Sequence, residues 1–173
     1  MDLAENDQTG TGGGLRYLTE KPSANMVNQE QAHSCQAACA RQLLRDAGVD
    51  LSETELLAEI GYYEGYGTTA EDTAPVLSRF HPQLEYAAGS IPLEALPILF
   101  KRDSWIVNLK TDHGTVHSVI VDGLEGEVVR VRDPWGVNGP GSGTGTTATI
   151  TLHDFLEHWH WAINRAVIPN RRK

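Results

Sequence analysis

Cysteines, long apolar runs and positive charge are all scarce in this sequence, and each shortage excludes a class of protein. The only cysteines among the 173 residues are Cys35 and Cys39. They lie about one helical turn apart, a spacing that disfavours a disulfide bond, so we expect free thiols in a reducing compartment. No apolar run approaches the roughly 20 residues that cross a bilayer, so we expect no membrane partner.

The start of the chain and its charge narrow the class further. Residues 1–10 lack the basic start and apolar core of a secretory signal, which predicts a protein that works in the cytoplasm or leaves by a route without a cleavable signal. Fourteen Lys and Arg stand against 23 Asp and Glu, a net charge of −9. Binding to phosphates needs a basic face, so we expect no nucleic-acid partner and interpret the basic residues 171–173 as a solvated tail.

The chain divides into a leader and one domain. Residues 1–25 are rich in glycine and poor in large apolar residues, which predicts a flexible leader. Residues 26–173 are long enough to form one domain with a sizeable core. Capping residues (Ser34, Ser52 with Glu55, and Thr69) and helical periodicity predict that its first half is helical. The expected helices span residues 34–47, 52–61, 69–80 and 92–100.

From residue 104 the pattern changes to runs rich in Val and Ile, bounded by turn residues, which predict strands. We expect a short hairpin at residues 124–126 and a helix at 152–158. This order predicts an α+β fold in two layers, with a helical front half packed on an antiparallel sheet. The expected strands span residues 104–110, 116–122, 127–132, 147–151 and 162–168.

Three residues of the predicted domain suit nucleophilic catalysis. Cys35 begins the first helix, where the helix dipole favours a thiolate, although a small buried thiol is an equal alternative. His117 lies inside a strand, and its alternative is a core histidine bonded to a carbonyl. Asp133 ends the next strand, where a turn residue is the alternative. Antiparallel pairing would bring His117 and Asp133 together, so that the acid orients the imidazole that activates the thiol.

An acyl-transfer site also needs hydrogen-bond donors for the oxyanion. Gln29, six residues before Cys35, and the Cys35 backbone N–H are candidates. Gln31 and Gln36 compete for this role, and a surface glutamine is the plain alternative for Gln29.

Two aromatic residues are candidates for a substrate groove. Tyr66 lies in a predicted loop and Trp135 follows Asp133, with core or rim packing as the alternative for each. The two cysteines lack the paired second half of a zinc motif. We therefore expect neither a metal nor another cofactor.

Three segments resemble the double-glycine peptidases, papain-like domains best known from bacteriocin exporters, where they remove leader peptides after a Gly-Gly pair. Residues 29–48, QEQAHSCQAACARQLLRDAG, are similar to the segment around the family's nucleophile. Residues 117–136, HSVIVDGLEGEVVRVRDPWG, are similar to its His-strand-turn-strand-Asp-Pro segment, and residues 66–69 to the connection after its second helix. The resemblance implies a papain-like fold in which Cys35 is the nucleophile and His117 the general base. It also implies that Asp133 is the orienting carboxylate and Gln29 the oxyanion donor.

The resemblance further implies a cysteine endopeptidase that cuts a protein or peptide substrate after a Gly-Gly site. Small papain-like domains also occur as toxic effectors in competition between bacteria. We therefore hypothesise a toxin delivered by a specialised secretion system into a target cell's cytoplasm and neutralised in the producer by a cognate immunity protein. Residues 12–14, Gly-Gly-Gly, are a candidate self-cleavage site, with a flexible linker as the alternative.

Two other functions stay open on the sequence. A papain-fold glutamine deamidase or transglutaminase would share the acyl-thioester step and differ in the acceptor. A catalytically inactive papain-like binding module would keep the fold with a buried, unreactive Cys35.

Overall fold

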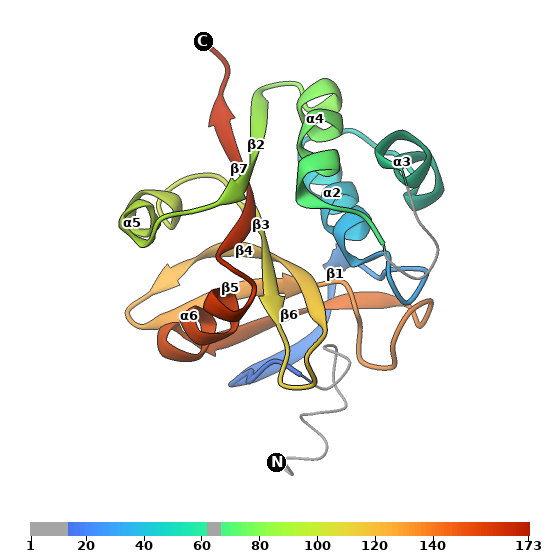
Figure 1. The fold of residues 1–173 in the computed structure, drawn as a ribbon. Coiled ribbons are helices and arrows are strands. Elements are labelled where there is room, and N and C mark those ends of the chain that lie inside the picture. Colours follow the sequence, from blue (N-terminus) through green and yellow to red (C-terminus); the bar gives the residue numbers. More distant parts are fainter. Residues whose placement is uncertain (1–13, 62–66) are drawn as a thin grey trace.

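The computed structural model describes residues 14–61 and 67–173, and its framework is one antiparallel sheet (Figure 1). In this sheet the strand order is β1-β6-β5-β4-β3-β7-β2, and all six neighbouring pairs are antiparallel. The strands are β1 (Thr19–Val27), β2 (Leu84–Ser90), β3 (Trp105–Lys110), β4 (Val116–Glu125), β5 (Val128–Asp133), β6 (Thr144–Thr151) and β7 (Arg165–Arg171).

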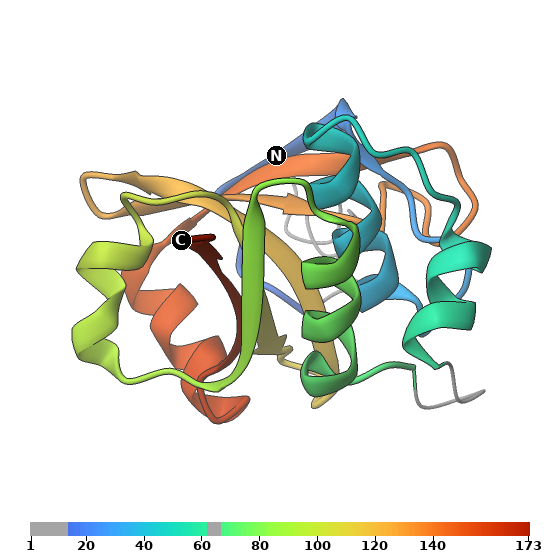
Figure 2. The ribbon, with the colours of Figure 1, turned by 90° about the horizontal axis from the view of Figure 1, so that it is seen from above.

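Helices lie on both sides of this sheet (Figures 1 and 2). On one side α2 packs against β4 and α4 against β2, with α3 against both helices. On the other side α6 packs against β3. The helices are α2 (Cys35–Asp46), α3 (Glu53–Ile60), α4 (Ala70–Phe80), α5 (Leu96–Leu99) and α6 (Leu152–Trp161), with a 3₁₀ turn, η1 (Leu93–Ala95), before α5.

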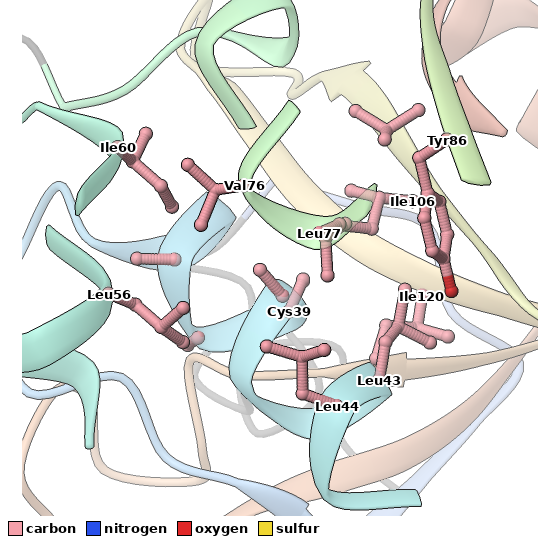
Figure 3. Packing of buried hydrophobic residues seen from close by; sticks show 14 of the residues in the cluster. Cys39, Leu43, Leu44, Leu56, Ile60, Val76, Leu77, Tyr86, Ile106 and Ile120 are labelled. Atoms are coloured by element: carbon pink, nitrogen blue, oxygen red, sulfur yellow. The ribbon is translucent and has the colours of Figure 1, made fainter. Parts of the chain in front are cut away.

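The predicted α+β class, with a helical front half on an antiparallel sheet, is confirmed, but the expected two layers are in fact three. The reason lies in the central strands, which are apolar on both faces. Ile106 and Ile120 face the core under α2–α4, shown in Figure 3. Trp105 and Val107 belong to the second core, under α5 and α6. A strand buried on both faces needs a cover on each.

The predicted leader boundary at residue 25 is wrong for residues 14–25. Leu15 and Tyr17 are buried in the second core, and Thr19–Val27 forms the edge strand β1, paired with β6. Most side chains of β1 are exposed or half-buried, and Pro22 is tolerated because an edge strand leaves some N–H groups unpaired. The low apolar content of residues 19–25 thus reflects an exposed edge strand and not a flexible leader. Residues 1–13 lie outside the described residues.

The predicted caps of α3 and α4 are confirmed. Ser52 and Glu55 form the expected capping box, and Thr69 caps α4 through the N–H of Asp72. None of the helices in the described ranges is long and apolar enough to span a bilayer.

Candidate active site

The nucleophile candidate, Cys35, is the first residue of α2 and is partly exposed. Ser34 was expected to cap this helix, but its hydroxyl instead bonds the backbone of Gln31, donating to the carbonyl and accepting from the N–H. The buried carboxyl of Glu53 on α3 accepts from the N–H of Glu30. These bonds fix the loop that leads into Cys35, so the thiol is presented from a rigid helix start.

His117 on β4 and Asp133 at the end of β5 meet as the strand order predicts. The Nε2 of His117 donates to Oδ1 of Asp133 at 2.7 Å, and their side chains are 7% and 0% exposed. A carboxylate only accepts, so Nε2 carries the proton and Nδ1 is the ring nitrogen left for Cys35. The structure thus places Asp133 on one nitrogen of the His117 ring and leaves the other nitrogen for Cys35.

The charges of this triad reinforce one another. Burial is the largest single influence on His117 and opposes the imidazolium, but the charge and hydrogen bond of Asp133 together with those of Cys35 outweigh it and raise the pKa of His117 well above its ordinary value. Burial likewise opposes the thiolate, but the hydrogen bond and charge of His117 together with hydrogen bonds of Ser118 outweigh it and lower the pKa of Cys35. Both directions favour a thiolate–imidazolium pair, the reactive form of a cysteine nucleophile.

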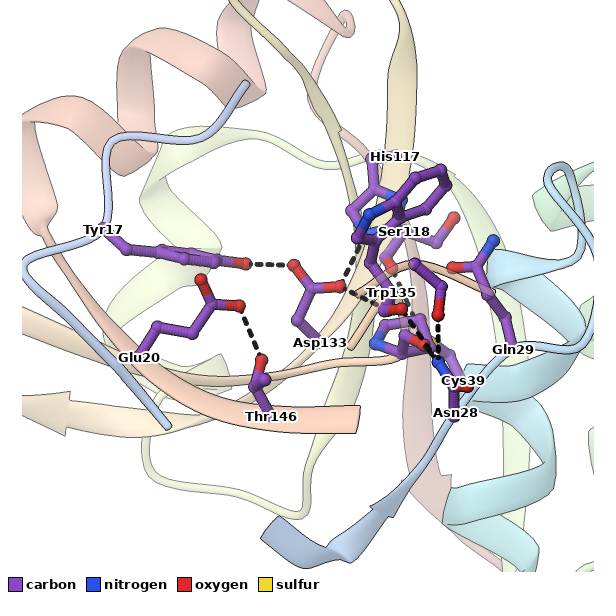
Figure 4. Close-up of polar contacts among 12 residues, drawn as sticks. Tyr17, Glu20, Asn28, Gln29, Cys39, His117, Ser118, Asp133, Trp135 and Thr146 are labelled. Carbon is purple, nitrogen blue, oxygen red and sulfur yellow. Dashed lines mark hydrogen bonds and ion pairs between the residues drawn. The ribbon is translucent and has the colours of Figure 1, made fainter. Parts of the chain in front are cut away.

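Asp133 has two further hydrogen-bond donors, shown in Figure 4. The backbone N–H of Trp135 donates to Oδ1 at 2.9 Å, and the Tyr17 hydroxyl donates to Oδ2 at 2.7 Å. Burial and the nearby carboxylate raise the pKa of Tyr17 well above its ordinary value, so the phenol keeps its proton. Sequence reasoning missed Tyr17. The apolar Leu15, Tyr17 and Leu18 were a signal that this segment packs, but not of what it contacts.

A cleft of about 360 Å³ opens beside the triad. Trp135 lines it and sets the edge of its ring against His117, with centroids 6.2 Å apart and planes at 87°. This is the place predicted for Trp135, whereas Tyr66 lies outside the described residues. The cleft is lined by Cys35, His117 and Trp135 together with the polar residues Gln36, Asn108 and Ser118.

The polar side of the cleft is held together by Ser118, the residue after His117. Its hydroxyl donates to Oε1 of Gln36 at 2.5 Å and lies 3.1 Å from Oδ1 of Asn108. The thiol of Cys39 donates to the carbonyl of Ser118 at 3.4 Å. Cys39 is therefore a packing residue that ties α2 to β4, next to Cys35 and His117.

Gln29, the predicted oxyanion donor, is fully buried and does not line the cleft. Its Nε2 donates to the carbonyls of Gln31 at 2.8 Å and Ala32 at 3.3 Å. Both amide hydrogens are used inside the loop, so this geometry supports a loop-building role for Gln29. An oxyanion role would need the amide to turn.

Asn28 is a second residue that sequence reasoning missed. Its Nδ2 lies within hydrogen-bond distance of the carbonyls of Pro134, Trp135 and Gly139, and its Oδ1 accepts from the N–H groups of residues 142–143. One side chain therefore shapes the glycine-rich loop after Asp133 and places Trp135 over the cleft.

No protein-family model matches the chain, and no curated protein matches its sequence. Solved structures share its fold, among them the following two. The peptidase domain of Streptococcus ComA, a bifunctional ABC transporter involved in quorum sensing, superposes with a TM-score of 0.62 at 18% identity, covering 85% of this chain and 98% of that domain. A double-glycine-motif protease from an AMS/PCAT transporter, in complex with a leader peptide, gives a TM-score of 0.61 at 16% identity, covering 90% and 94%. The fold is papain-like. It is the fold of double-glycine peptidase domains.

Proposed function

We propose that this chain is a cysteine peptidase with Cys35, His117 and Asp133 as its catalytic triad. The observation that carries the proposal is the buried 2.7 Å contact of His117 with Asp133, on the same imidazole that faces Cys35 at the cleft. Nucleophile, base and orienting acid in this arrangement constitute the apparatus of acyl transfer.

In the proposed reaction the Cys35 sulfur adds to the peptide carbonyl carbon, and the electron pair moves onto the oxygen. The first turn of an α-helix leaves backbone N–H groups without intrahelical acceptors, and in the proposed reaction those of α2, together with the helix dipole, stabilise this oxyanion. Collapse breaks the C–N bond while His117 gives its proton to the leaving amine. Water, deprotonated by His117, then hydrolyses the thioester and restores the pair. Asp133 stays ionised and holds the ring throughout.

We extend the proposal to substrates that are cut after a Gly-Gly pair. The support is the double-glycine-motif protease with the same fold, which was solved with a leader peptide bound. Delivery as an interbacterial toxin and neutralisation by an immunity protein rest on the sequence resemblance alone and stay predictions.

Self-cleavage within residues 12–14 also stays a prediction, and the structure restricts it. The carbonyl of Gly14 accepts from the N–H of Asp112 at 2.8 Å, and a Cβ on Gly14 would collide with the side chain of Thr111. The bond after Gly14 is therefore held in the fold, and cutting it requires this segment to leave its place. Gly12 and Gly13 lie outside the described residues.

The test uses a set of peptides with a central Gly-Gly pair and varied flanks, matched Ala-Ala peptides, and the Cys35→Ala variant as the control. Mass spectrometry should show cleavage after Gly-Gly with the wild-type protein only. A gain of about one dalton on glutamine-containing peptides, without cleavage, would replace the peptidase with a deamidase, which shares the thioester step. If the peptides show neither cleavage nor a gain of one dalton, and Cys35 is unreactive, the chain is a binding module.

A further inference from the structure

Asp133 is bound on both oxygens, and one of its donors comes from the far N-terminal side of the fold. His117 and the Trp135 N–H occupy Oδ1, whereas Tyr17 donates to Oδ2 across a sequence separation of 116 residues. The Asp133 side chain is completely buried, so water cannot replace the phenol. A buried carboxylate that loses a donor keeps its desolvation cost without compensation.

Tyr17 is itself held by its neighbours in the segment 14–18. Arg16 makes ion pairs with Asp112 in the β3–β4 connection and with Asp154 and Glu157 on α6. The Gly14 carbonyl bonds the N–H of the same Asp112. The segment thus spans from the hairpin that carries His117 to the helix on the other sheet face.

The docking continues on the C-terminal side of Tyr17. The N–H of Leu18 donates to the carbonyl of Thr149 at 2.7 Å, where β1 begins to pair with β6. Hydrogen bonds and ion pairs therefore hold the residues on both sides of Tyr17, and these contacts fix the position of its phenol beside Asp133. Because its pKa is raised, it stays a donor across the working pH range of a cysteine peptidase.

We infer that Tyr17 is a positioning residue of the triad, and that segment 14–18 acts as a clamp on the catalytic carboxylate. This inference rests on the proposed function and adds a fourth member to its site. The phenol stabilises the Asp133 anion, and the anion stabilises the His117 imidazolium, which in turn stabilises the Cys35 thiolate. Without the phenol, the Asp133 carboxylate is held less firmly against His117, so the imidazolium is less stabilised and part of the thiolate returns to the neutral thiol near neutral pH.

The experiment measures the rate of Cys35 alkylation by iodoacetamide from pH 4 to pH 8, on the full chain in a Cys39→Ala background. Tyr17→Phe removes only the hydroxyl and keeps the ring. Tyr86→Phe is the matched control, because Tyr86 is a buried tyrosine that packs in the other core, under α2–α4. We expect Tyr17→Phe to alkylate about tenfold more slowly near pH 6 and to gain reactivity only toward the ordinary thiol pKa of about 8.5, with the profile of Tyr86→Phe unchanged.

Three outcomes overturn the clamp while leaving the peptidase proposal standing. The first is a pH profile of Tyr17→Phe that coincides with that of the wild type, and the second is an equal change in the profiles of both variants. The third is a loss of reactivity that follows a lower melting temperature without any change of the pH profile. A wild-type Cys35 with an ordinary thiol profile, by contrast, sinks the proposed function itself.

Discussion

Replacing Asp133 by Asn isolates the charge of the orienting residue from its shape. The amide keeps an oxygen that can accept from His117 Nε2 and the Trp135 N–H, while its NH₂ faces the Tyr17 hydroxyl, which can turn to accept. Only the negative charge is lost. A hydrogen bond to a charged group contributes about 1.5–3 kcal/mol, so we expect the thiolate–imidazolium pair to weaken by roughly 10- to 100-fold.

The sign of the effect follows from the pKa shifts. In the wild type the pKa of His117 is raised and that of Cys35 is lowered, and the reactive pair exists in the window between them. Without the carboxylate the pKa of His117 falls, so the imidazolium and with it the reactive pair are lost at a lower pH. The assay is the pH profile of kcat/KM on a cleaved peptide, with Asp133→Ala as the more severe comparison. An Asp133→Asn protein with wild-type rate and profile would refute the coupling of this carboxylate to the imidazole.

Three further variants test the frame of the site. Gln29→Ala should lower the melting temperature together with activity, because the buried amide holds the loop before Cys35; a loss of about 100-fold in kcat at unchanged melting temperature would instead establish an oxyanion donor. Burial raises the pKa of Glu53 from 4.5 to about 7, so its contribution to stability is complete below pH 4.5 and is lost as pH rises through 7. The free energy of unfolding, measured with denaturant, should differ by about 3 kcal/mol between pH 5 and pH 8, and Glu53→Gln should remove this difference. A difference that persists in the variant contradicts the prediction. Asn28→Ala should cost about 2–3 kcal/mol of unfolding free energy, and protease cutting of the 134–143 loop should increase; an intact loop would show that Asn28 does not hold it.

The contact between His117 and Asp133 was predictable because the two residues lie on neighbouring strands of the sheet. His117 and Asp133 lie on consecutive antiparallel strands, and runs rich in β-branched residues, mostly Val, mark both strands in the sequence. Cys35 was predictable as a helix start followed by helical periodicity. Local signals of this kind depend on neighbours in sequence, so they survive folding unchanged.

The missed features depend on contacts far apart in sequence. The two unpredicted strands, β1 and β2, are the edges of the sheet, where only one side is paired and apolar alternation is weak. Tyr17 meets Asp133 across 116 residues, and Asn28 meets the Trp135 carbonyl across 107. No periodicity encodes such pairs. The low apolar content of residues 14–25 predicted a flexible leader and gave no signal of the contact between Tyr17 and Asp133.

The proposed function requires that Cys35 and His117 form a thiolate–imidazolium pair. The pH dependence of Cys35 alkylation tests this pair most directly. The measurement uses a Cys39→Ala background, because Cys39 is buried and its own pKa is raised by burial. We predict a Cys35 pKa well below the ordinary value of about 8.5, returning toward that value in His117→Ala. A slow thiol with an ordinary pKa that does not respond to His117→Ala would contradict the pairing of Cys35 with His117.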